Sequence, residues 1–317
     1  MLDGKFYYLV KEPVLEKKDF RLAFFRFSQI MHDRTNGIYN IIMQKIFKLI
    51  KPKVPLKPSK LLTNVQIYNI VSDLVRNGYR VLPITLSNSQ VNDLIDFCKK
   101  KTMYDGEGNA YKFDPEKLYY EKARYYWKMQ DILENKTVID LLSDSWLANI
   151  AQEYLGTKPI LTSISLWLDP PSKEKNYDPH VYHQDNDGIK YLKFFFYLTD
   201  VDEQSCPHRF IKGTHIERKP KKFSRIKRYS DEELLDYFGK KNEVVFTAKA
   251  GTIIAEDTKG FHKGSTPKSK YRLLMQIQFA ITDIPIYFPF CKDKNIKKIS
   301  IPSIDENLGS IYRKFAE

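Results

Sequence analysis

The sequence predicts a mainly β fold, a sandwich or barrel of short strands with flanking helices. From residue 160 onward, short apolar segments alternate with Gly and Pro turns, and no long helices are interleaved with them. A length of 317 residues can bury a sizeable core, as one large β-rich domain or as two small domains. The predicted strands are 160–168, 181–185, 192–198, 209–212, 244–247, 252–256 and 272–281, with a short helix at 231–238.

The composition is that of a folded protein in a reducing compartment. Hydrophobic residues make up 42% of the chain and aromatic residues 14%, which argues against a disordered chain. The longest purely apolar run, 194–198, is far shorter than the roughly 18–20 residues that span a bilayer. Segment 1–5 lacks the pattern of a signal peptide, so we expect none. Three widely spaced cysteines, Cys98, Cys206 and Cys291, favour a cytoplasmic location over a disulfide framework or a cysteine zinc site.

The chain carries a net charge of +13, and the surplus is densest at 45–60 and 212–228. A basic surface attracts anionic partners of any kind. We interpret 212–228 first as a solvated basic loop and second as a contact for an anionic small-molecule substrate or carrier. A membrane surface ranks third, and the wide spread of the lysines argues against nucleic acid as a partner.

Residues 1–62 are predicted to form a basic helical extension. Segments 20–31 and 38–50 have helical periodicity, and a stripe of isoleucines follows the second segment. We expect this stripe to pack on its own domain rather than on a membrane. Segment 51–58 is a linker, because its three prolines break the helical hydrogen-bond ladder. The stripe consists of Ile38, Ile41, Ile42, Ile46 and Ile50.

Two further helices have clear start signals. Thr63 with Gln66, and Ser87 with Gln90, have the spacing of capping boxes. The first helix is expected to end at Gly78 and the second near residue 101, with a short strand at 79–84 between them. Segment 137–155 is predicted to be one more helix, stopped by a glycine.

Alternation along two of the predicted strands indicates one apolar and one polar face. In 272–281, Leu273, Met275, Ile277 and Phe279 face one way, and Arg272, Gln276 and Gln278 face the other. In 160–168, Ile164, Leu166 and Leu168 oppose Ser163, Ser165 and Trp167. One face suits packing under helices and the other suits a polar cavity, which in a barrel is usually a ligand site.

The candidate metal ligands are His183, Asp185 and His262. On a strand, side chains two residues apart leave the same face, so His183 and Asp185 lie side by side. His262, 79 residues downstream, completes a set of two histidines and one carboxylate, which suits Fe(II) and leaves positions open for a 2-oxo acid and O₂. Arg272 follows ten residues later, and its planar guanidinium suits the remote carboxylate of such an acid.

These residues lie in motifs that resemble one known family. The segments Tyr182-His183-Gln184-Asp185, 192–202, 210–215, Phe261-His262-Lys263-Gly264 and 271–277 are similar to the phytanoyl-CoA dioxygenase (PhyH-like) family of Fe(II)/2-oxoglutarate-dependent dioxygenases. The resemblance covers roughly residues 68–282 and leaves the first 60 residues outside.

The resemblance implies a double-stranded β-helix (jelly-roll, cupin-like) core with flanking helices, mainly β in an α+β arrangement. It implies a dioxygenase domain at 63–290, with helices at 63–155 and the core at 160–282, and a tail at 291–317. His183, Asp185 and His262 would bind Fe(II), and Arg272 would anchor 2-oxoglutarate. Positions near the cosubstrate would correspond to Ser163, Trp167, His180 and Thr199.

The predicted reaction is hydroxylation of an unactivated C–H bond in a small metabolite, with O₂ consumed and succinate and CO₂ released. Many relatives carry serine where this chain has Gly264, so Ser265 or another group would substitute for it. Asp185 is retained, whereas halogenating relatives replace this carboxylate. Three alternatives stay open: an inert hydrogen-bonded pair at His183 and Asp185, a zinc-dependent hydrolase that also uses His180, and a non-catalytic β-barrel that binds an anionic glycan, lipid or nucleic acid.

Overall fold

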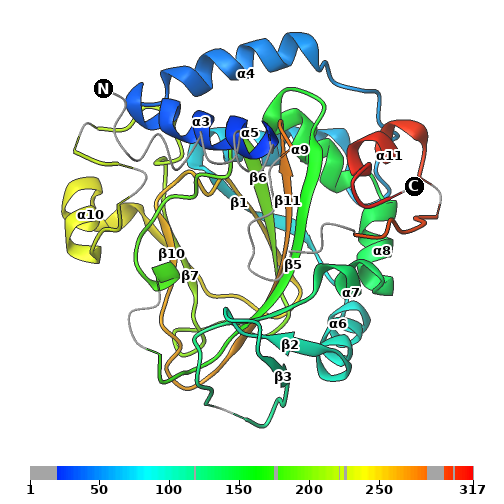
Figure 1. The fold of residues 1–317 in the computed structure, drawn as a ribbon, viewed down its shortest axis with the longest axis vertical. Helices are drawn as coiled ribbons and strands as arrows, with labels where there is room; N and C mark the ends of the chain where they lie inside the picture. The colour runs from blue at the N-terminus through cyan, green and yellow to red at the C-terminus, as the bar shows by residue number, and fades with distance from the viewer. Residues whose placement is uncertain are drawn as a thin grey trace.

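Two antiparallel β-sheets face each other, and helices cover the outer face of the larger sheet in the computed structural model (Figure 1). The structure describes residues 20–117, 119–174, 178–220, 222–224, 227–283, 296–302 and 304–316. Cys291 and parts of the predicted basic loop and C-terminal tail lie outside the described residues. Among the described helices, none combines the length and the apolar composition that a membrane crossing requires.

Within the described residues the larger sheet has eight strands in the order β1-β9-β6-β11-β5-β4-β2-β3, and the smaller has three in the order β10-β7-β8. The two sheets remain separate, so the core is an open sandwich and not a closed barrel. The strands are β1 (Tyr79–Thr85), β2 (Thr102–Tyr104), β3 (Ala110–Lys112), β4 (Tyr125–Trp127), β5 (Ile160–Asp169), β6 (Tyr191–Tyr197), β7 (His208–Ile211), β8 (Glu243–Phe246), β9 (Thr252–Glu256), β10 (His262–Gly264) and β11 (Arg272–Ala280).

The predicted fold class, mainly β with flanking helices and a double-stranded β-helix core, is confirmed. The predicted strand at 181–185 is reduced to single bridges at Tyr182 and His183. Segment 101–135, which carried no assignment, adds β2, β3 and β4 to the edge of the larger sheet.

The main core lies between the larger sheet and the helices. Leu273, Met275 and Ile277 of β11 are completely buried there, as their alternation predicts. The indole of Trp146 packs edge-on against Phe194 of β6; each fully buried side chain of this size contributes about 1.5–3 kcal/mol. The helices around the core are α5 (Asn64–Asn77), α6 (Asn88–Lys100), α7 (Met129–Leu133), α8 (Lys136–Ser143), α9 (Trp146–Leu155) and α11 (Glu306–Tyr312).

Helix boundaries follow the side-chain caps. Both predicted capping boxes form, at Thr63 of α5 and Ser87 of α6, and α5 ends at a left-handed Gly78. The predicted single helix at 137–155 is wrong, because α8 and α9 are separated at Asp144. The Asp144 carboxylate accepts a hydrogen bond from the Trp146 backbone N–H at 2.9 Å, a local contact that competes with the helical ladder.

The extension forms two antiparallel helices, α3 (Phe20–Arg34) and α4 (Ile38–Ile50), that lie across one end of the sandwich (Figure 1). The expectation that the isoleucine stripe of α4 packs on its own domain is wrong. The residues of α4 that are buried are Asn40 and Phe47. The Asn40 amide donates to the Ile189 carbonyl at 3.1 Å, and the Gln44 amide donates to Glu217 at 2.7 Å. Polar groups therefore hold α4 on the domain. The stripe residues Ile38, Ile42, Ile46 and Ile50 are exposed.

Candidate active site

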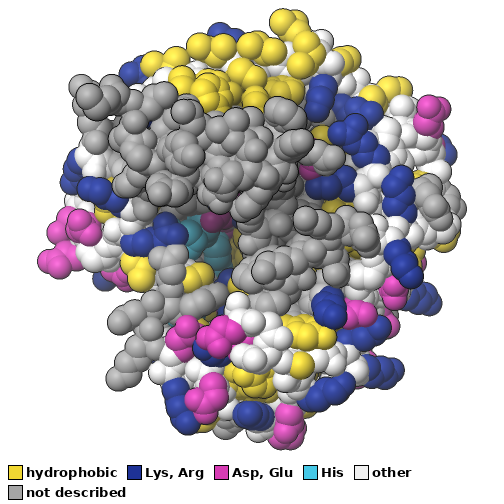
Figure 2. Space-filling view, in the orientation of Figure 1, with side chains coloured by type: hydrophobic (Ala, Val, Ile, Leu, Met, Phe, Trp, Pro, Cys, Tyr) yellow, Lys and Arg dark blue, Asp and Glu magenta, His cyan; other side chains and the backbone are white. Residues whose placement is uncertain are grey.

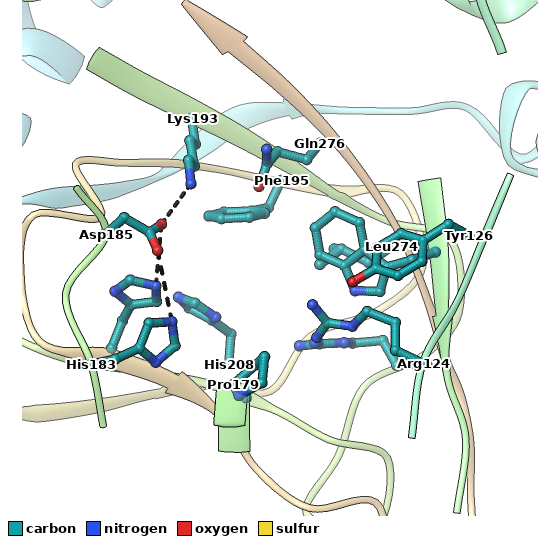
Figure 3. Close-up of a pocket in the computed structure, with 14 residues that line it drawn as sticks. Arg124, Tyr126, Pro179, His183, Asp185, Lys193, Phe195, His208, Leu274 and Gln276 are labelled. Carbon is teal, nitrogen blue, oxygen red and sulfur yellow. Dashed lines mark hydrogen bonds and ion pairs between the residues drawn. The ribbon is translucent and has the colours of Figure 1, made fainter. Parts of the chain in front are cut away.

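A cavity of about 210 Å³ lies between the two sheets and opens on the face shown in Figure 2, where histidine side chains are visible in a hollow. Both sheets and two connecting segments line it (Figure 3). One face each of β5, β6 and β11 lines it, and for β5 and β11 this is the face that the alternation of side chains predicts. The lining residues are Arg124, Tyr126, Trp167, Pro179, His183, Asp185, Lys193, Phe195, His208, His262, Gly264, Arg272, Leu274 and Gln276.

The backbone brings the two histidines together. His183 and His262 form an antiparallel bridge in which each backbone N–H donates to the other residue's carbonyl at 3.0 Å. Residues paired in this way project their side chains from the same face. The imidazole centroids are 4.3 Å apart. The backbone of Asp185 is anchored separately, because its N–H donates to the Thr258 carbonyl at 2.9 Å.

Each imidazole is oriented by a hydrogen bond to a backbone carbonyl. The Nδ1 of His183 lies 2.8 Å from the Val181 carbonyl, and the Nδ1 of His262 lies 3.0 Å from the Gly260 carbonyl. A carbonyl can only accept, so each Nδ1 carries the proton and each Nε2 presents a lone pair. Hydrogen bonds of this kind hold histidine ligands in many metal sites.

The two Nε2 atoms converge on one carboxylate. The His183 Nε2 lies 3.8 Å from Asp185 Oδ1, and the His262 Nε2 lies 3.5 Å from Oδ2 (Figure 3). One donor atom from each residue lies within 4.8 Å of the others. Two neutral imidazoles and a carboxylate on one side of a cavity are the donor set of a 2-His-1-carboxylate iron site. The three residues thus fit a metal ion by geometry and by donor chemistry.

Positive charge and burial at this site favour an ionised Asp185 and a neutral His262. Burial raises the pKa of Asp185, but nearby positive charge, chiefly the Lys193 ammonium, outweighs burial and holds this pKa far below its usual value. Burial also lowers the pKa of His262 well below its usual value. The Lys193 ammonium lies 2.5 Å from Asp185 Oδ2 and 2.8 Å from Asp187 Oδ2. Lys193 thereby restrains the carboxylate from the side away from the histidines (Figure 3).

A second charged group lies at the other end of the cavity, around Asp169. Its carboxylate accepts from Arg124 Nε at 2.6 Å, from Arg272 Nη2 at 2.6 Å and Nε at 3.1 Å, and from the Trp167 indole at 2.9 Å. Burial raises the pKa of Asp169, but the two guanidiniums outweigh burial and lower it to about 2. Two arginines share one carboxylate, so the group keeps one net positive charge.

Arg272 has donor capacity left for a ligand. The residue is 1% exposed and lines the cavity, and its Nη1 has no hydrogen-bond partner within the described residues. A buried guanidinium nitrogen without a partner costs free energy unless a ligand binds it. A carboxylate is the group that a guanidinium binds best. The cavity thus combines a metal-type donor set with an arginine suited to an organic acid.

The remaining predicted site residues lie at different distances from this cavity. Trp167 lines it, while Ser163 is buried further along β5 and its hydroxyl has no hydrogen-bond partner in the described part of the chain. The Thr199 hydroxyl accepts from the Leu273 backbone N–H at 3.2 Å, outside the cavity lining. His180 lies beside Asp169, and burial lowers its pKa to about 4. His180 is therefore not part of the group formed by His183, Asp185 and His262.

Several of the residues that line the cavity were not predicted from the sequence. Lys193 is a single charged residue within a strand of otherwise apolar residues, which was an available signal. His208 also lines the cavity, and its Nε2 lies 2.9 Å from Glu256. Arg124 and Tyr126 had no local signal, because they reach the cavity only through the pairing of β4 with β5.

Cys206 lies against Gly264, where many members of the family that the sequence resembles carry a serine. A Cβ added at Gly264 would lie 3.2 Å from the Cys206 sulfur and 3.5 Å from Arg272 Nη2. The hydroxyl of the neighbouring Ser265 accepts from Arg209 Nε at 2.8 Å.

The side chains of Asp169, His180 and Cys206 also bring three donor atoms together. This group does not suit a cation, because the guanidiniums of Arg124 and Arg272 already hold the carboxylate. Burial raises the pKa of the Cys206 thiol to about 12, which keeps the sulfur protonated in the metal-free protein.

Sequence comparisons give no assignment, since no family model and no curated protein matches the chain. Solved structures do match. The epimerase SnoN, in complex with Fe3+, alpha ketoglutarate and nogalamycin RO, aligns with a TM-score of 0.50 and 16% identity, over 75% of this chain and 93% of that chain. EctD from S. alaskensis in its apoform aligns at 0.48, with 16% identity over 76% and 85% of the two chains. HygX from Streptomyces hygroscopicus with nickel and 2-oxoglutarate aligns at 0.47, with 13% identity over 71% and 88%.

The likeness to SnoN establishes the fold. The chain has the double-stranded β-helix architecture with flanking helices, the architecture that the resemblance to the PhyH-like family implies. At this level of identity the likeness concerns the fold, and the chemistry has to be argued from the side chains of the cavity.

Proposed function

We propose that the protein is an Fe(II)- and 2-oxoglutarate-dependent dioxygenase that hydroxylates an unactivated C–H bond. One observation carries the proposal. The cavity joins a 2-His-1-carboxylate donor set, formed by His183, Asp185 and His262, to the buried Arg272, whose Nη1 has no hydrogen-bond partner among the described residues. The Fe3+ and alpha ketoglutarate bound to the similarly folded SnoN support this interpretation. SnoN is an epimerase, so another oxidative outcome is the nearest variant of the proposal.

The chain's own residues would have distinct roles. His183, Asp185 and His262 would hold Fe(II) on one face, and Lys193 would orient the Asp185 carboxylate. Bound Fe(II) and 2-oxoglutarate would supply the activation of O₂, with release of succinate and CO₂. Arg272 would bind the remote carboxylate of 2-oxoglutarate, with Asp169 fixing its guanidinium plane.

The two alternative functions have less support. The zinc hydrolase needed His180 beside His183 and Asp185, but His180 lies with Asp169 and Cys206. A non-catalytic binding module would not need two imidazoles whose Nε2 lone pairs converge on a carboxylate beside a cavity. An open donor set of this type is typical of a catalytic centre.

Metal and cosubstrate binding test the proposal directly. Anaerobic titration with Fe(II) and 2-oxoglutarate is expected to give a weak visible charge-transfer band, and His183→Ala or Asp185→Ala is expected to abolish it. Asp140→Asn, at an exposed carboxylate on α8, is the matched control and leaves the band intact. Arg272→Met weakens 2-oxoglutarate binding at least about 30-fold, because a buried charge pair contributes about 2 kcal/mol or more. Protein that binds neither Fe(II) nor 2-oxoglutarate refutes the proposal.

We further propose a small-molecule substrate with an anionic group and a cytoplasmic location. The overall charge of +13 supports the anionic group. The free, buried thiols of Cys98 and Cys206 support a reducing compartment. In a metabolite screen by 2-oxoglutarate turnover, exclusive stimulation by uncharged compounds would contradict the anionic substrate. Lys219 of the basic loop is buried and donates to the Thr214 and Ile216 carbonyls, so it holds the loop together.

A further inference from the structure

Helix α4 carries a row of large apolar side chains on the outside of the molecule. Ile38, Ile42, Ile46, Leu49 and Ile50 are all exposed, with Leu49 at 82%, Ile50 at 63% and Ile42 at 52%. Positions 38, 42, 46 and 49 follow one another at spacings of four, four and three, which places them on one side of the helix. We call these five residues the outer apolar face. Figure 2 shows hydrophobic side chains along the edge of the molecule where Figure 1 places α4.

The orientation of α4 is fixed by polar contacts on its other side. Glu217 accepts from the Gln44 amide at 2.7 Å, lies 3.0 Å from the His32 ring and pairs with the buried ammonium of Lys259. The Asn40 amide adds a bond to the Ile189 carbonyl. Rotation of α4 about its axis, which would bury the isoleucines, would break this buried network at a cost of several kcal/mol. The outward position of the apolar face is therefore stable.

The apolar face continues onto the neighbouring helix. Phe24 and Phe27 of α3 are exposed as well, and Phe27 packs edge-on against Tyr39 of α4. Contiguous exposed apolar surface that is fixed in place by its neighbours usually marks an interaction site.

The segment that carries the outer apolar face is strongly basic. Residues 20–60 contain nine lysines and arginines and one acidic residue, Asp33. Lys45 and Lys48 of α4 are exposed, and Lys45 lies on the same side of the helix as Ile38 and Leu49. The full set is Arg21, Arg26, Arg34, Lys45, Lys48, Lys51, Lys53, Lys57 and Lys60.

From this combination we propose that α3 and α4 form a docking surface for an anionic lipid membrane. A helix that lies in a membrane interface buries an apolar face among the acyl chains and places Lys and Arg at the level of the headgroups. A second copy of the chain is a poorer occupant, because a symmetric contact would bring two strongly basic surfaces together. Residues 1–19 are also a poorer occupant, since they carry as many acidic as basic residues and offer no net charge to match.

Co-sedimentation of the full-length protein with vesicles tests the surface. Binding is expected for equal parts of phosphatidylcholine and phosphatidylglycerol, and much weaker binding for phosphatidylcholine alone. The triple variant Ile42→Ser, Ile46→Ser and Leu49→Ser is expected to bind at least about 100-fold more weakly, because three large apolar side chains no longer enter the acyl region. The matched variant Ile42→Leu, Ile46→Leu and Leu49→Ile keeps the apolar area and is expected to retain binding.

The basic residues are tested separately. Lys45→Gln with Lys48→Gln is expected to weaken binding to the anionic vesicles about 30-fold, because each lysine near such a surface contributes about 1 kcal/mol. The control pair Lys240→Gln and Lys241→Gln, at exposed lysines on a distant short helix, is expected to change binding much less.

Three outcomes would overturn the proposal. One is wild-type protein that does not bind anionic vesicles, and another is a serine variant that binds as well as wild type. The third is a wild-type dimer in light scattering that the serine variant dissociates, which would identify a second copy as the occupant. The test does not depend on the proposed dioxygenase activity, because it measures neither iron nor 2-oxoglutarate.

Discussion

Asp169→Asn is the most informative single perturbation of the cavity. The substitution keeps the shape of the side chain and removes the charge that holds two guanidiniums, of which Arg272 is fully buried. An amide oxygen can still accept one hydrogen bond. The amide nitrogen, however, is itself a donor and would face the N–H groups of the guanidiniums. The cluster therefore loses both charge and hydrogen-bond complementarity.

The size of the effect follows from the pKa of the carboxylate. The pKa of Asp169 is lowered from 3.8 to about 2, and each unit corresponds to about 1.4 kcal/mol, so the ionised group contributes about 2.5 kcal/mol to folding. Removal of one partner from a buried ion pair typically costs 3–5 kcal/mol. We therefore expect the free energy of unfolding at neutral pH to fall by about 2.5–4 kcal/mol. A folded-state pKa below the unfolded value means that this contribution is complete above pH 3.8 and is lost as pH falls toward 2.

Urea denaturation of wild type, Asp169→Asn and the exposed control Asp140→Asn tests the predicted loss of stability and its predicted dependence on pH. The difference in unfolding free energy between wild type and Asp169→Asn is expected to be largest at neutral pH and to shrink as the pH falls from about 4 to 2. The control is expected to stay within about 0.5 kcal/mol of wild type. Equal stability of Asp169→Asn and wild type at neutral pH, or a difference that does not change with pH, would refute the reasoning.

Two further substitutions test contacts beside the candidate ligands. Lys193→Met removes the buried cation between Asp185 and Asp187 and is expected to lower the free energy of unfolding by about 3 kcal/mol in metal-free protein at neutral pH; a loss below about 1 kcal/mol in urea denaturation would contradict the role of this ion pair. Gly264→Ala places a methyl group 3.2 Å from the Cys206 sulfur and is expected to cost about 1–3 kcal/mol. In a Cys206→Ala background this cost is expected to fall by at least about 0.5 kcal/mol, and additive effects in the double-mutant cycle would contradict the contact.

Features that depend on local alternation could be predicted from the sequence. The faces of β11 follow from the two-residue period, so Arg272 and Gln276 were expected to face a polar cavity, as they do. The pairing of His183 with Asp185 follows from the same period, although the segment forms single bridges rather than a long strand. Local side-chain geometry is encoded within a few residues, which is why these predictions succeeded.

Features that depend on tertiary pairing could not be predicted. Arg124 reaches the cavity because Tyr125 pairs with Leu168 across two strands more than 40 residues apart in sequence, and no local pattern indicates this pairing. Asp169 is the last residue of β5, a position that an aspartate at a surface turn could equally occupy. Its role depends on the two arginines that contact it, and the sequence does not show those contacts. An apolar stripe on a helix usually faces inward, but that of α4 faces outward. The opposite, polar side of α4 faces the domain because Gln44 binds Glu217, a residue far away in sequence.

The bridge between His183 and His262 also has a consequence for how the protein folds. Its two residues are 79 apart in sequence, so the chain must close a long loop before the imidazoles meet. Contacts of this sequence separation form slowly relative to helices and hairpins. In the unfolded chain nothing holds His262 beside His183 and Asp185, so this particular set of three ligands is assembled only when the protein folds. A metal ion is therefore expected to bind the native state selectively and to slow unfolding more than it speeds refolding.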